Sequence, residues 1–536
     1  MFAPPALNRT RSASESERMY DLTIVGGGLS GTLTLIYLLD ELLATPIGAE
    51  WSPSAFHVAW IDRASDFGSG FAYGHAAHPK FLLNNDVSSM NVGGFHAWLG
   101  EHRSRWQARL DREADPAVQN WLSRHRESLD AARNNPGLYL GMFLPRCIFG
   151  MFLSDWLANS LDRARQRGVT IDLFSQRASA VGRESNKLHV TTREGNSLRT
   201  TALLIAVGSL PPDPIPLLET KKGFIHEWRM PDGGASLRET AQAVNQHKGR
   251  QCTAIIIGSH AAAIETLYAT AHDSTLTELF RDICVISPSG RLPNAASAHR
   301  RYFRADKLPR LLAASQISAE SLISAALADV EQGKHDGFTS ADCSDAICDS
   351  FGKLFPLLSP EQKLCFVEQY GARFTALNRH TPPDYAEAAE SLRKKGKLRT
   401  IAGKVVEITH VNDHFEVVVR HPGETESSEK ISADIVINCQ GAGLLSRSDD
   451  PFLRTLIDPQ NGIARLNRSG LGIAVSSTFE ASPGVFIIGP LLAGHSEGTL
   501  HLWNLERAER IEGLAKRTAS ILARRLLSGE PAAVTN

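Results

Sequence analysis

A glycine-rich turn near the start of the chain, Gly26 to Gly31, constrains the fold more than any other feature of the sequence. It follows a short apolar run, Tyr20 to Val25, which is typical of a strand buried on both faces. After the turn, apolar residues recur every three or four positions, at Leu29, Leu33, Ile36, Leu39 and Leu43. This spacing predicts one buried face of a helix. The order of strand, glycine turn and helix is that of a dinucleotide-binding unit.

The glycines of this turn have separate physical roles in such a unit. Gly26 permits the tight turn, Gly28 lets a diphosphate approach the backbone, and Gly31 lets the helix pack closely on the strand. Free N–H groups and the helix dipole attract the phosphates. The next predicted strand, Ala55 to Asp62, ends in an acid that can accept a hydrogen bond from a ribose hydroxyl. We therefore predict a dinucleotide site here, with a purely structural turn as the alternative.

Length and composition narrow the class of protein and its partners. A chain of 536 residues is long for one hydrophobic core, so two or three structural units are expected. The net charge of −1 gives no bulk field that would recruit nucleic acid or a membrane surface, which leaves small molecules as the expected partners. The 7 cysteines form no CxxC pair, so we expect thiols in a reducing cytoplasm and no metal site. No apolar run is long enough to predict a membrane span.

The predicted fold class is α/β, with two Rossmann-like dinucleotide-binding domains and a helical insertion. Residues 1–18 combine Pro, Ser and alternating charges, which predicts a disordered tail. Residues 19–210 would form the first part of one dinucleotide-binding domain, and residues 211–300 a second nucleotide-binding-like domain built on another strand, turn and helix. Residues 301–397 are predicted to be mostly helical, and residues 398–536 to form strands that return to the first dinucleotide-binding domain before a final helix.

Several motifs follow one another in an order that carries a family resemblance. They include "GGGLSG", "FLPRCIFGMFL", "LLIAVGSLPP", "DIVINCQG" and "VFIIGPLLAG". With these motifs the chain resembles the FAD-NAD(P)-binding flavoproteins, the family of the FAD-dependent urate hydroxylase type and of aspartate N-hydroxylating monooxygenases. The resemblance implies an FAD-dependent oxidoreductase. More narrowly, it implies an NAD(P)H-dependent monooxygenase that uses oxygen and a flavin C4a-hydroperoxide to hydroxylate a small amino acid, amine or purine.

The resemblance also implies which residues lie at the flavin. Gly26, Gly28, Gly31 and Asp62 would hold the ADP half of FAD. Residues from other segments would complete the site: Gly208 in a second flavin-domain loop, Gly489 at the flavin end, and Leu83, Asn84 and Met90 beside the isoalloxazine. Arg146 would contact a phosphate or an anionic substrate, and the alternative is a surface arginine that caps a helix. No residue is assigned a catalytic role.

The second predicted nucleotide turn departs from the family pattern. It reads Gly258-Ser259-His260, with Ala263 where a third glycine is expected. A side chain at position 260 crowds the closest approach of a diphosphate. If a nicotinamide cofactor binds, NADPH is favoured, because Arg291 lies near a strand end that has no acid. Two alternatives stay open: a flavin dehydrogenase or oxidase without oxygen insertion, and a flavin-binding protein whose nicotinamide site has decayed.

Overall fold

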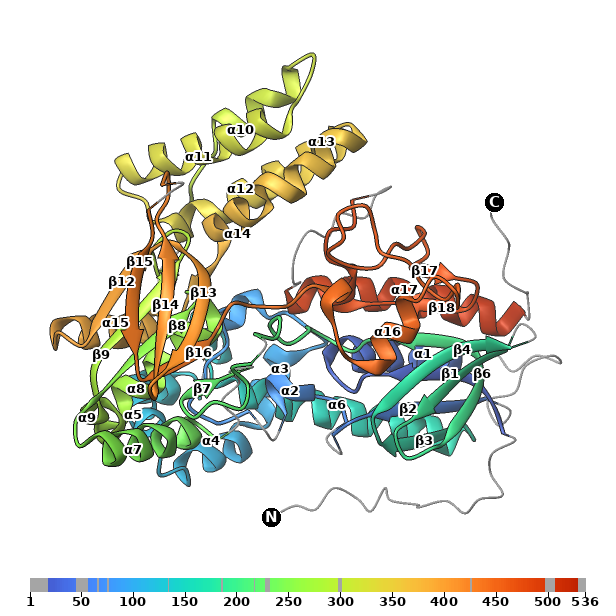
Figure 1. Ribbon diagram of the computed structural model, residues 1–536. Coiled ribbons are helices and arrows are strands. Elements are labelled where there is room, and N and C mark those ends of the chain that lie inside the picture. The colour runs from blue at the N-terminus through green and yellow to red at the C-terminus, as the bar shows by residue number, and fades with distance from the viewer. Residues whose placement is uncertain are drawn as a thin grey trace.

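The computed structural model describes residues 18–44, 56–64, 67–74, 77–133, 135–184, 187–215, 217–226, 232–296, 301–424, 427–496 and 507–528. Apart from Arg18, the predicted tail of residues 1–18 lies outside these ranges. The described chain forms two lobes, each built on a parallel sheet, with a group of helices above them (Figure 1). The predicted α/β class is therefore confirmed.

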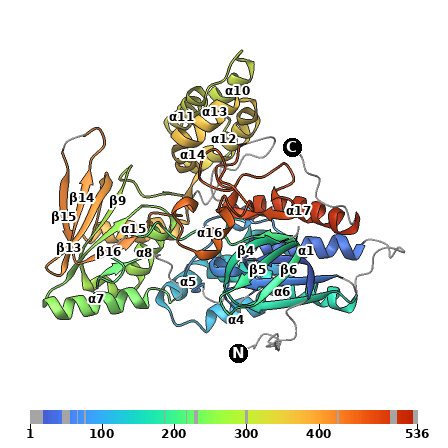
Figure 2. The ribbon, with the colours of Figure 1, turned by 45° about the vertical axis from the view of Figure 1, so that its right-hand side comes forward.

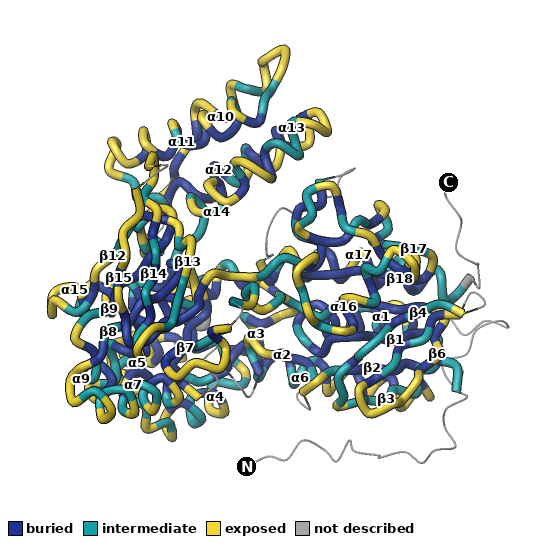
Figure 3. Tube along the Cα trace, in the orientation of Figure 1, coloured by how far each residue is buried: buried dark blue, intermediate teal, exposed yellow. Residues whose placement is uncertain are grey.

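The first sheet contains the strand that leads into the first glycine turn. Its parallel strands lie in the order β18, β6, β1, β2, β3. Their bounds are Met19–Val25 (β1), His57–Asp62 (β2), Thr170–Ser175 (β3), Ser197–Ile205 (β6) and Val485–Ile487 (β18). The antiparallel strands β4 (Ala178–Glu184), β5 (Lys187–Thr192) and β17 (Glu480–Ser482) extend it. Parallel neighbours flank β1 on both sides, and Figure 3 shows it in the buried interior, which explains why its second half, Leu22 to Val25, is almost wholly apolar.

Long helices cover this sheet and connect it to the second lobe. Helix α1 packs against both α6 and α17. The bounds are Leu29–Ala44 (α1), Phe95–Glu101 (α3), Arg103–Asp111 (α4), Pro116–Ala131 (α5), Arg146–Gln166 (α6) and Ala508–Ser528 (α17). Helix α5 contacts α8 of the second lobe, so one hydrophobic core continues from the first sheet into the second. Within the described ranges, no helix has the length and apolar character that crossing a membrane requires.

The second sheet is parallel, in the order β12, β9, β8, β16, β7. Its strands are Phe224–Ile225 (β7), Cys252–Ile257 (β8), Phe280–Ser287 (β9), Leu398–Ala402 (β12) and Ile435–Asn438 (β16), and its helices are Ala235–Lys248 (α7), Ala261–His272 (α8), Ser274–Leu279 (α9) and Pro383–Lys394 (α15). An antiparallel sheet of β13 (Lys404–Val411), β14 (His414–Arg420) and β15 (Glu429–Ala433) lies on it. Alternate residues of β8 face opposite cores: Ile255 packs with Phe415 of β14, while Ile256 faces the core that contains α8.

The strand pairing corrects one predicted boundary. The chain does not return to the first sheet at residue 398, because β12 pairs with β9 and β16 pairs with β8. Helix α15 also belongs to the second lobe, where the rings of Tyr268 and Tyr385 lie 4.6 Å apart. The return follows Asn438, through α16 (Pro451–Ile457), to β17 and β18.

The remaining helices form a separate group with its own hydrophobic core. The group comprises α10 (Lys307–Arg310), α11 (Ala319–His335), α12 (Ser340–Leu354), α13 (Pro360–Cys365) and α14 (Gly371–Asn378). Figure 2 shows these helices bundled above α17. Their core is rich in phenylalanine and is distinct from the core around the first sheet. After α14, the short strand β11 (His380–Thr381) pairs with β10 (Asn294–Ala295) and leads the chain back to the second lobe.

Because this core is separate, we expect Phe366→Ala to loosen the helical group selectively. Phe366 is fully buried, and the rings of Phe351 and Phe374 lie 5.0 and 5.8 Å from it. Removing such a ring costs about 3–5 kcal/mol. Hydrogen exchange should show lost protection in α11 to α14 and unchanged protection in β1 and β8. Leu357→Ala, at a side chain that is 60% exposed, is the matched control. Equal loss of protection in all elements would contradict a separate core.

Candidate functional site

The first glycine turn closes tightly over the end of the first sheet. The Gly26 N–H donates a hydrogen bond to the Ile61 carbonyl at 2.9 Å, and the φ of Gly26 is +114°. A Cβ at position 26 would lie 2.2 Å from the Ala206 oxygen, and one at position 31 would lie 2.4 Å from the Gly26 oxygen. Neither position has room for a side chain, so the glycines fix the start of α1 directly above the strand ends.

Gly28 is different, because space surrounds it. The nearest atom to a Cβ at this position is the Gly70 Cα, at 4.0 Å. That atom belongs to α2 (Gly70–Tyr73), which follows a loop joined to the turn by a hydrogen bond from the Gly68 N–H to the Gly27 oxygen at 3.0 Å. The first N–H groups of α1 point out of the helix start beside Gly28, where a diphosphate can reach them. The turn therefore fits the diphosphate of FAD.

The acid at the end of β2 is fixed against the same turn. One carboxylate oxygen of Asp62 accepts a hydrogen bond from the Gly27 N–H at 2.5 Å, and the other accepts one from the Ala64 N–H at 2.7 Å. A carboxylate has room for further hydrogen bonds beyond these two. The position is thus compatible with a ribose hydroxyl, and that role for Asp62 stays a prediction.

Two other predicted flavin-site glycines lie on neighbouring strands. Gly489 follows β18 with φ +83°, and a Cβ there would lie 2.6 Å from the Ser30 Oγ in α1. The loop after β18 therefore touches the helix that the glycine turn begins. Gly208 follows β6, the neighbour of β1, with φ +80° and no atom within 4 Å of a Cβ. The structure thus brings these loops to one edge of the first sheet.

The predicted isoalloxazine loop is held beside the arginine motif. The Leu83 N–H donates to the Leu144 carbonyl and the Arg146 N–H donates to the Phe81 carbonyl, both at 2.8 Å. Leu83 and Met90 are buried, whereas Asn84 is exposed. These hydrogen bonds place Leu83 next to Arg146, as a shared site requires.

Arg146 has a partner that neither sequence-based interpretation included. Its guanidinium forms an ion pair with Glu265 of α8, with Nη1 2.9 Å from Oε1, and lies over the Phe81 ring. Burial raises the pKa of Glu265, while the charge of Arg146 opposes that rise. Nearby, the Leu82 N–H donates to the hydroxyl of Tyr385 at 2.7 Å. Arg146 is therefore part of the contact between the lobes, not a surface cap, and an anionic ligand would have to compete with Glu265 for it.

The second nucleotide turn repeats the backbone geometry of the first. The Gly258 N–H donates to the Ile286 carbonyl at 2.8 Å, the φ of Gly258 is +97°, and a Cβ there would lie 2.2 Å from the Cys439 oxygen. His260 is the exposed N-cap residue of α8. Arg291 is exposed on the loop after β9. The tight turn is thus retained although its second and third glycines are replaced.

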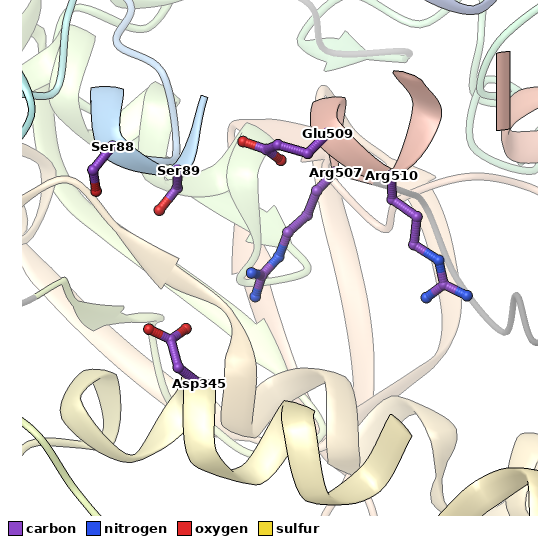
Figure 4. A pocket seen from close by; sticks show the side chains of 6 residues that line it. All are labelled: Ser88, Ser89, Asp345, Arg507, Glu509 and Arg510. Carbon is purple, nitrogen blue, oxygen red and sulfur yellow. The ribbon is translucent and has the colours of Figure 1, made fainter. Parts of the chain in front are cut away.

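A polar cavity of about 440 Å³, open to solvent and lined by exposed side chains that include Asp345 and Arg507, lies beside the predicted isoalloxazine loop. Figure 4 shows Arg507 pointing down from the start of α17 and Asp345 pointing up from α12, with Ser88 and Ser89 on a further side. Glu509 and Arg510 complete the lining. Sequence analysis missed this set because its members come from η3 (Val87–Ser89), α12 and α17, and no local motif joins them.

Glu509 stands out in this lining. Its Oε1 is buried and has no hydrogen-bond partner among the residues that the structure describes. Burial raises the pKa of Glu509, and the nearby carboxylates of Glu512 and Asp86 add to the rise, while Arg507 opposes it. Such a carboxyl in a cavity is a candidate for proton transfer.

Two relatives are similar to nearly the whole chain. Uncharacterized proteins of Mycobacterium tuberculosis and Mycobacterium bovis are 29% identical to the chain over 532 residues, which covers 96% of this chain and 97% of theirs. Their similarity extends over both lobes and the helical group.

Solved structures show the same fold at low sequence identity. The ornithine hydroxylase PvdA of Pseudomonas aeruginosa matches with a TM-score of 0.53 at 14% identity, covering 95% of this chain and 100% of that one. The cadaverine monooxygenase DfoA of Erwinia amylovora, bound to FAD, matches with a TM-score of 0.52 at 12% identity and 96% coverage of both chains. The L-lysine 6-monooxygenase of Pseudomonas syringae matches with a TM-score of 0.52 at 16% identity, covering 94% of this chain and 99% of that one.

A family model covers the first part of the first lobe. It describes FAD-NAD(P)-binding proteins and matches residues 23–210, the segment that runs from β1 past β6. This segment contains the first glycine turn, Asp62, the isoalloxazine loop and Arg146. The resemblance inferred from the motifs is confirmed, and residues 23–210 belong to an FAD-NAD(P)-binding domain.

Proposed function

We propose that this protein is an FAD-dependent monooxygenase that takes reducing equivalents from NADPH and hydroxylates a small amino acid, amine or purine with oxygen. The observation that carries the proposal is the pair of glycine turns, at Gly26 and Gly258, which have the same geometry and each end a parallel strand of a separate sheet. A protein with one resident flavin and one exchanging nicotinamide needs two such turns. The similar structures of PvdA and DfoA, an ornithine hydroxylase and a cadaverine monooxygenase, support the reaction class.

In this proposal the protein binds and orients the cofactor, while FAD supplies the redox chemistry and the reaction with oxygen. The turn from Gly26 to Gly31 holds the diphosphate on the start of α1. Leu83 and Met90 are buried and apolar, so this loop would exclude water from the reacting end of the flavin. Free thiols at all 7 cysteines agree with a reducing cytoplasm as the location.

The polar cavity is the proposed substrate site. Its volume of about 440 Å³ suits a small metabolite. Its arginines, Arg507 and Arg510, can pair with a substrate carboxylate, while Asp345 can pair with an ammonium group. The raised pKa of Glu509 lets its buried Oε1 hold a proton that an amine substrate can exchange. This chemistry favours an amino acid or amine over a purine.

The retained turn at Gly258 supports a working nicotinamide site. Its φ of +97° and its close approach to the Cys439 carbonyl keep the start of α8 above the strand ends, where a diphosphate can reach the first N–H groups of the helix. Reduction by NADPH is therefore part of the proposal.

The FAD-loaded protein should lose its visible flavin absorbance when NADPH is added without oxygen. When air and a panel of amino acids, diamines and purines are then supplied, one class should gain an oxygen atom, detected by mass spectrometry. Hydrogen peroxide as the sole product with every compound would instead identify an oxidase. Unchanged absorbance with both NADPH and NADH would identify a flavin-binding protein with no nicotinamide reductant.

Alanine at the first turn should separate folding from FAD binding. Gly28→Ala has space in the protein itself but crowds the diphosphate, so we expect a normal melting temperature and an FAD affinity reduced by at least about tenfold, or ~1.4 kcal/mol. Gly26→Ala should lower both the melting temperature and the FAD affinity, because the added Cβ would clash with the Ala206 carbonyl. Gly513→Ala, with no atom within 4 Å of the new Cβ on α17, is the control. An unchanged FAD affinity in Gly28→Ala would show that the diphosphate of FAD does not bind at this turn.

Substitution in the cavity should affect the substrate and not the reductant. We expect Asp345→Asn to raise the substrate KM about 10- to 100-fold, the range for a lost charge-assisted hydrogen bond of about 1.5–3 kcal/mol. Flavin reduction by NADPH should keep its rate. Asp349→Asn, at an exposed acid one turn later on α12, is the matched control and should leave KM unchanged. Equal KM values for the two variants would place the substrate elsewhere.

A further inference from the structure

The carboxyl edge of the second sheet gathers buried polar atoms that have no partner. Strand β8 leads into the Gly258 turn, and its neighbours β9 and β16 end in Ser287 and Asn438. Ser287 is 5% exposed and Asn438 is 0% exposed. The Ser287 Oγ and the Asn438 Nδ2 make no hydrogen bond with the part of the chain that the structure describes. Buried polar atoms without partners are costly, so this edge is suited to a ligand that supplies the missing hydrogen bonds.

An arginine without a counter-charge lies by the same edge. Arg379 is the C-cap residue that follows α14 and directly precedes β11, which pairs with β10 on the segment that follows β9. Burial lowers the pKa of Arg379, and no neighbouring acid opposes that change. Within the described ranges its guanidinium forms neither an ion pair nor a hydrogen bond. Arg146 differs, since Glu265 balances its charge. A half-buried guanidinium with no acid beside it has the electrostatic character of an anion site.

His260 lies within reach of the charge on Arg379. Partial loss of hydration and the positive charge of Arg379 both lower the pKa of His260, which favours the neutral form of the imidazole. His260 is also the N-cap residue of α8, a helix of 12 residues whose first N–H groups are directed toward the turn. The start of α8 and the imidazole of His260 therefore lie within the electrostatic influence of an unpaired guanidinium, at a turn position where the first lobe has Gly28.

We propose that Arg379 and His260 bind the diphosphate of a nicotinamide dinucleotide, replacing with side-chain donors the backbone approach that a glycine at position 260 would provide. Arg291, on the loop after β9, takes the 2′-phosphate of NADPH. The inference rests on the proposed function and names the residues that hold its reductant. It also accounts for the departure from the glycine pattern, because the side chain at 260 contacts the phosphates instead of blocking them.

The test measures binding alone, with the FAD-loaded full-length protein. Dissociation constants for NADP⁺ and NAD⁺ are obtained by calorimetry, since neither nucleotide reduces the flavin. We expect Arg379→Ala to weaken both nucleotides about 10- to 100-fold, because both carry the diphosphate. Arg373→Ala removes an exposed arginine from the same helix α14 and should change neither constant. Equal constants for wild type and Arg379→Ala would overturn the assignment.

His260→Gly gives opposite results for contact and for crowding. If the imidazole donates to the diphosphate, the variant binds both nucleotides several-fold more weakly. If the imidazole crowds the diphosphate, His260→Gly binds both nucleotides more tightly, and the inference is overturned for His260. Arg291→Ala should weaken NADP⁺ about 10- to 100-fold and leave NAD⁺ unchanged, because only NADP⁺ carries the 2′-phosphate. If Arg291→Ala weakens the binding of both nucleotides, or of neither, Arg291 does not bind the 2′-phosphate.

Arg379→Lys distinguishes a loss of nucleotide binding from a folding defect. It keeps the charge and loses the guanidinium fork, so we expect an affinity between those of wild type and Arg379→Ala, with an unchanged melting temperature. Wild-type protein that binds neither nucleotide would overturn the inference, while hydroxylation after chemical reduction of the flavin would still support the proposed function. If the nucleotide affinities of the variants change as described but no hydroxylated product forms, the inference is supported and the proposed function is contradicted.

Discussion

The close contact between a glycine and the carbonyl of a neighbouring strand is the constraint on which both lobes depend. Gly26 meets the Ala206 oxygen in one lobe, and Gly258 meets the Cys439 oxygen in the other. In each, the missing side chain lets the chain turn at the sheet edge and start a helix with its free N–H groups above the strand ends. The loops after β6 and β18 lie at the first of these sheet edges, and those after β9 and β16 lie at the second.

The buried contact between the lobes fixes how these two edges face each other. Arg146 at the start of α6 pairs with Glu265 in α8, and the Tyr385 hydroxyl accepts a hydrogen bond from the Leu82 N–H. A buried ion pair adds little net stability, but separating its members leaves two uncompensated charges. The lobes therefore resist sliding past each other along this contact, and the loop around Leu83 stays in register with the second nucleotide turn. An arginine that the family resemblance assigns to ligand binding here has a structural partner as well.

Local sequence patterns predicted the strand, turn and helix units because their signals lie within about 25 consecutive residues. The partners of β12 and β16 were predicted wrongly, since an apolar run of four or five residues shows that a strand is buried but not which sheet buries it. The cavity could not be predicted from local patterns either, because Ser88, Asp345 and Arg507 come together only after three separate elements have packed. Arg379 lacked any signal, because its importance lies in the absence of a nearby acid, which is a property of the folded chain.

In the proposed function, the two turns hold cofactors that must stay bound for different times. FAD remains through the reaction cycle, and the first turn offers it rigid backbone groups that lose no side-chain freedom on binding. The nicotinamide dinucleotide must leave once it has delivered its hydride. Binding through His260 and Arg379 costs the ordering of a side chain at each contact, so the net affinity is lower for the same number of hydrogen bonds. Replacing a glycine by a histidine in the second turn therefore suits an exchanging reductant, whereas the same change in the first turn would loosen the flavin.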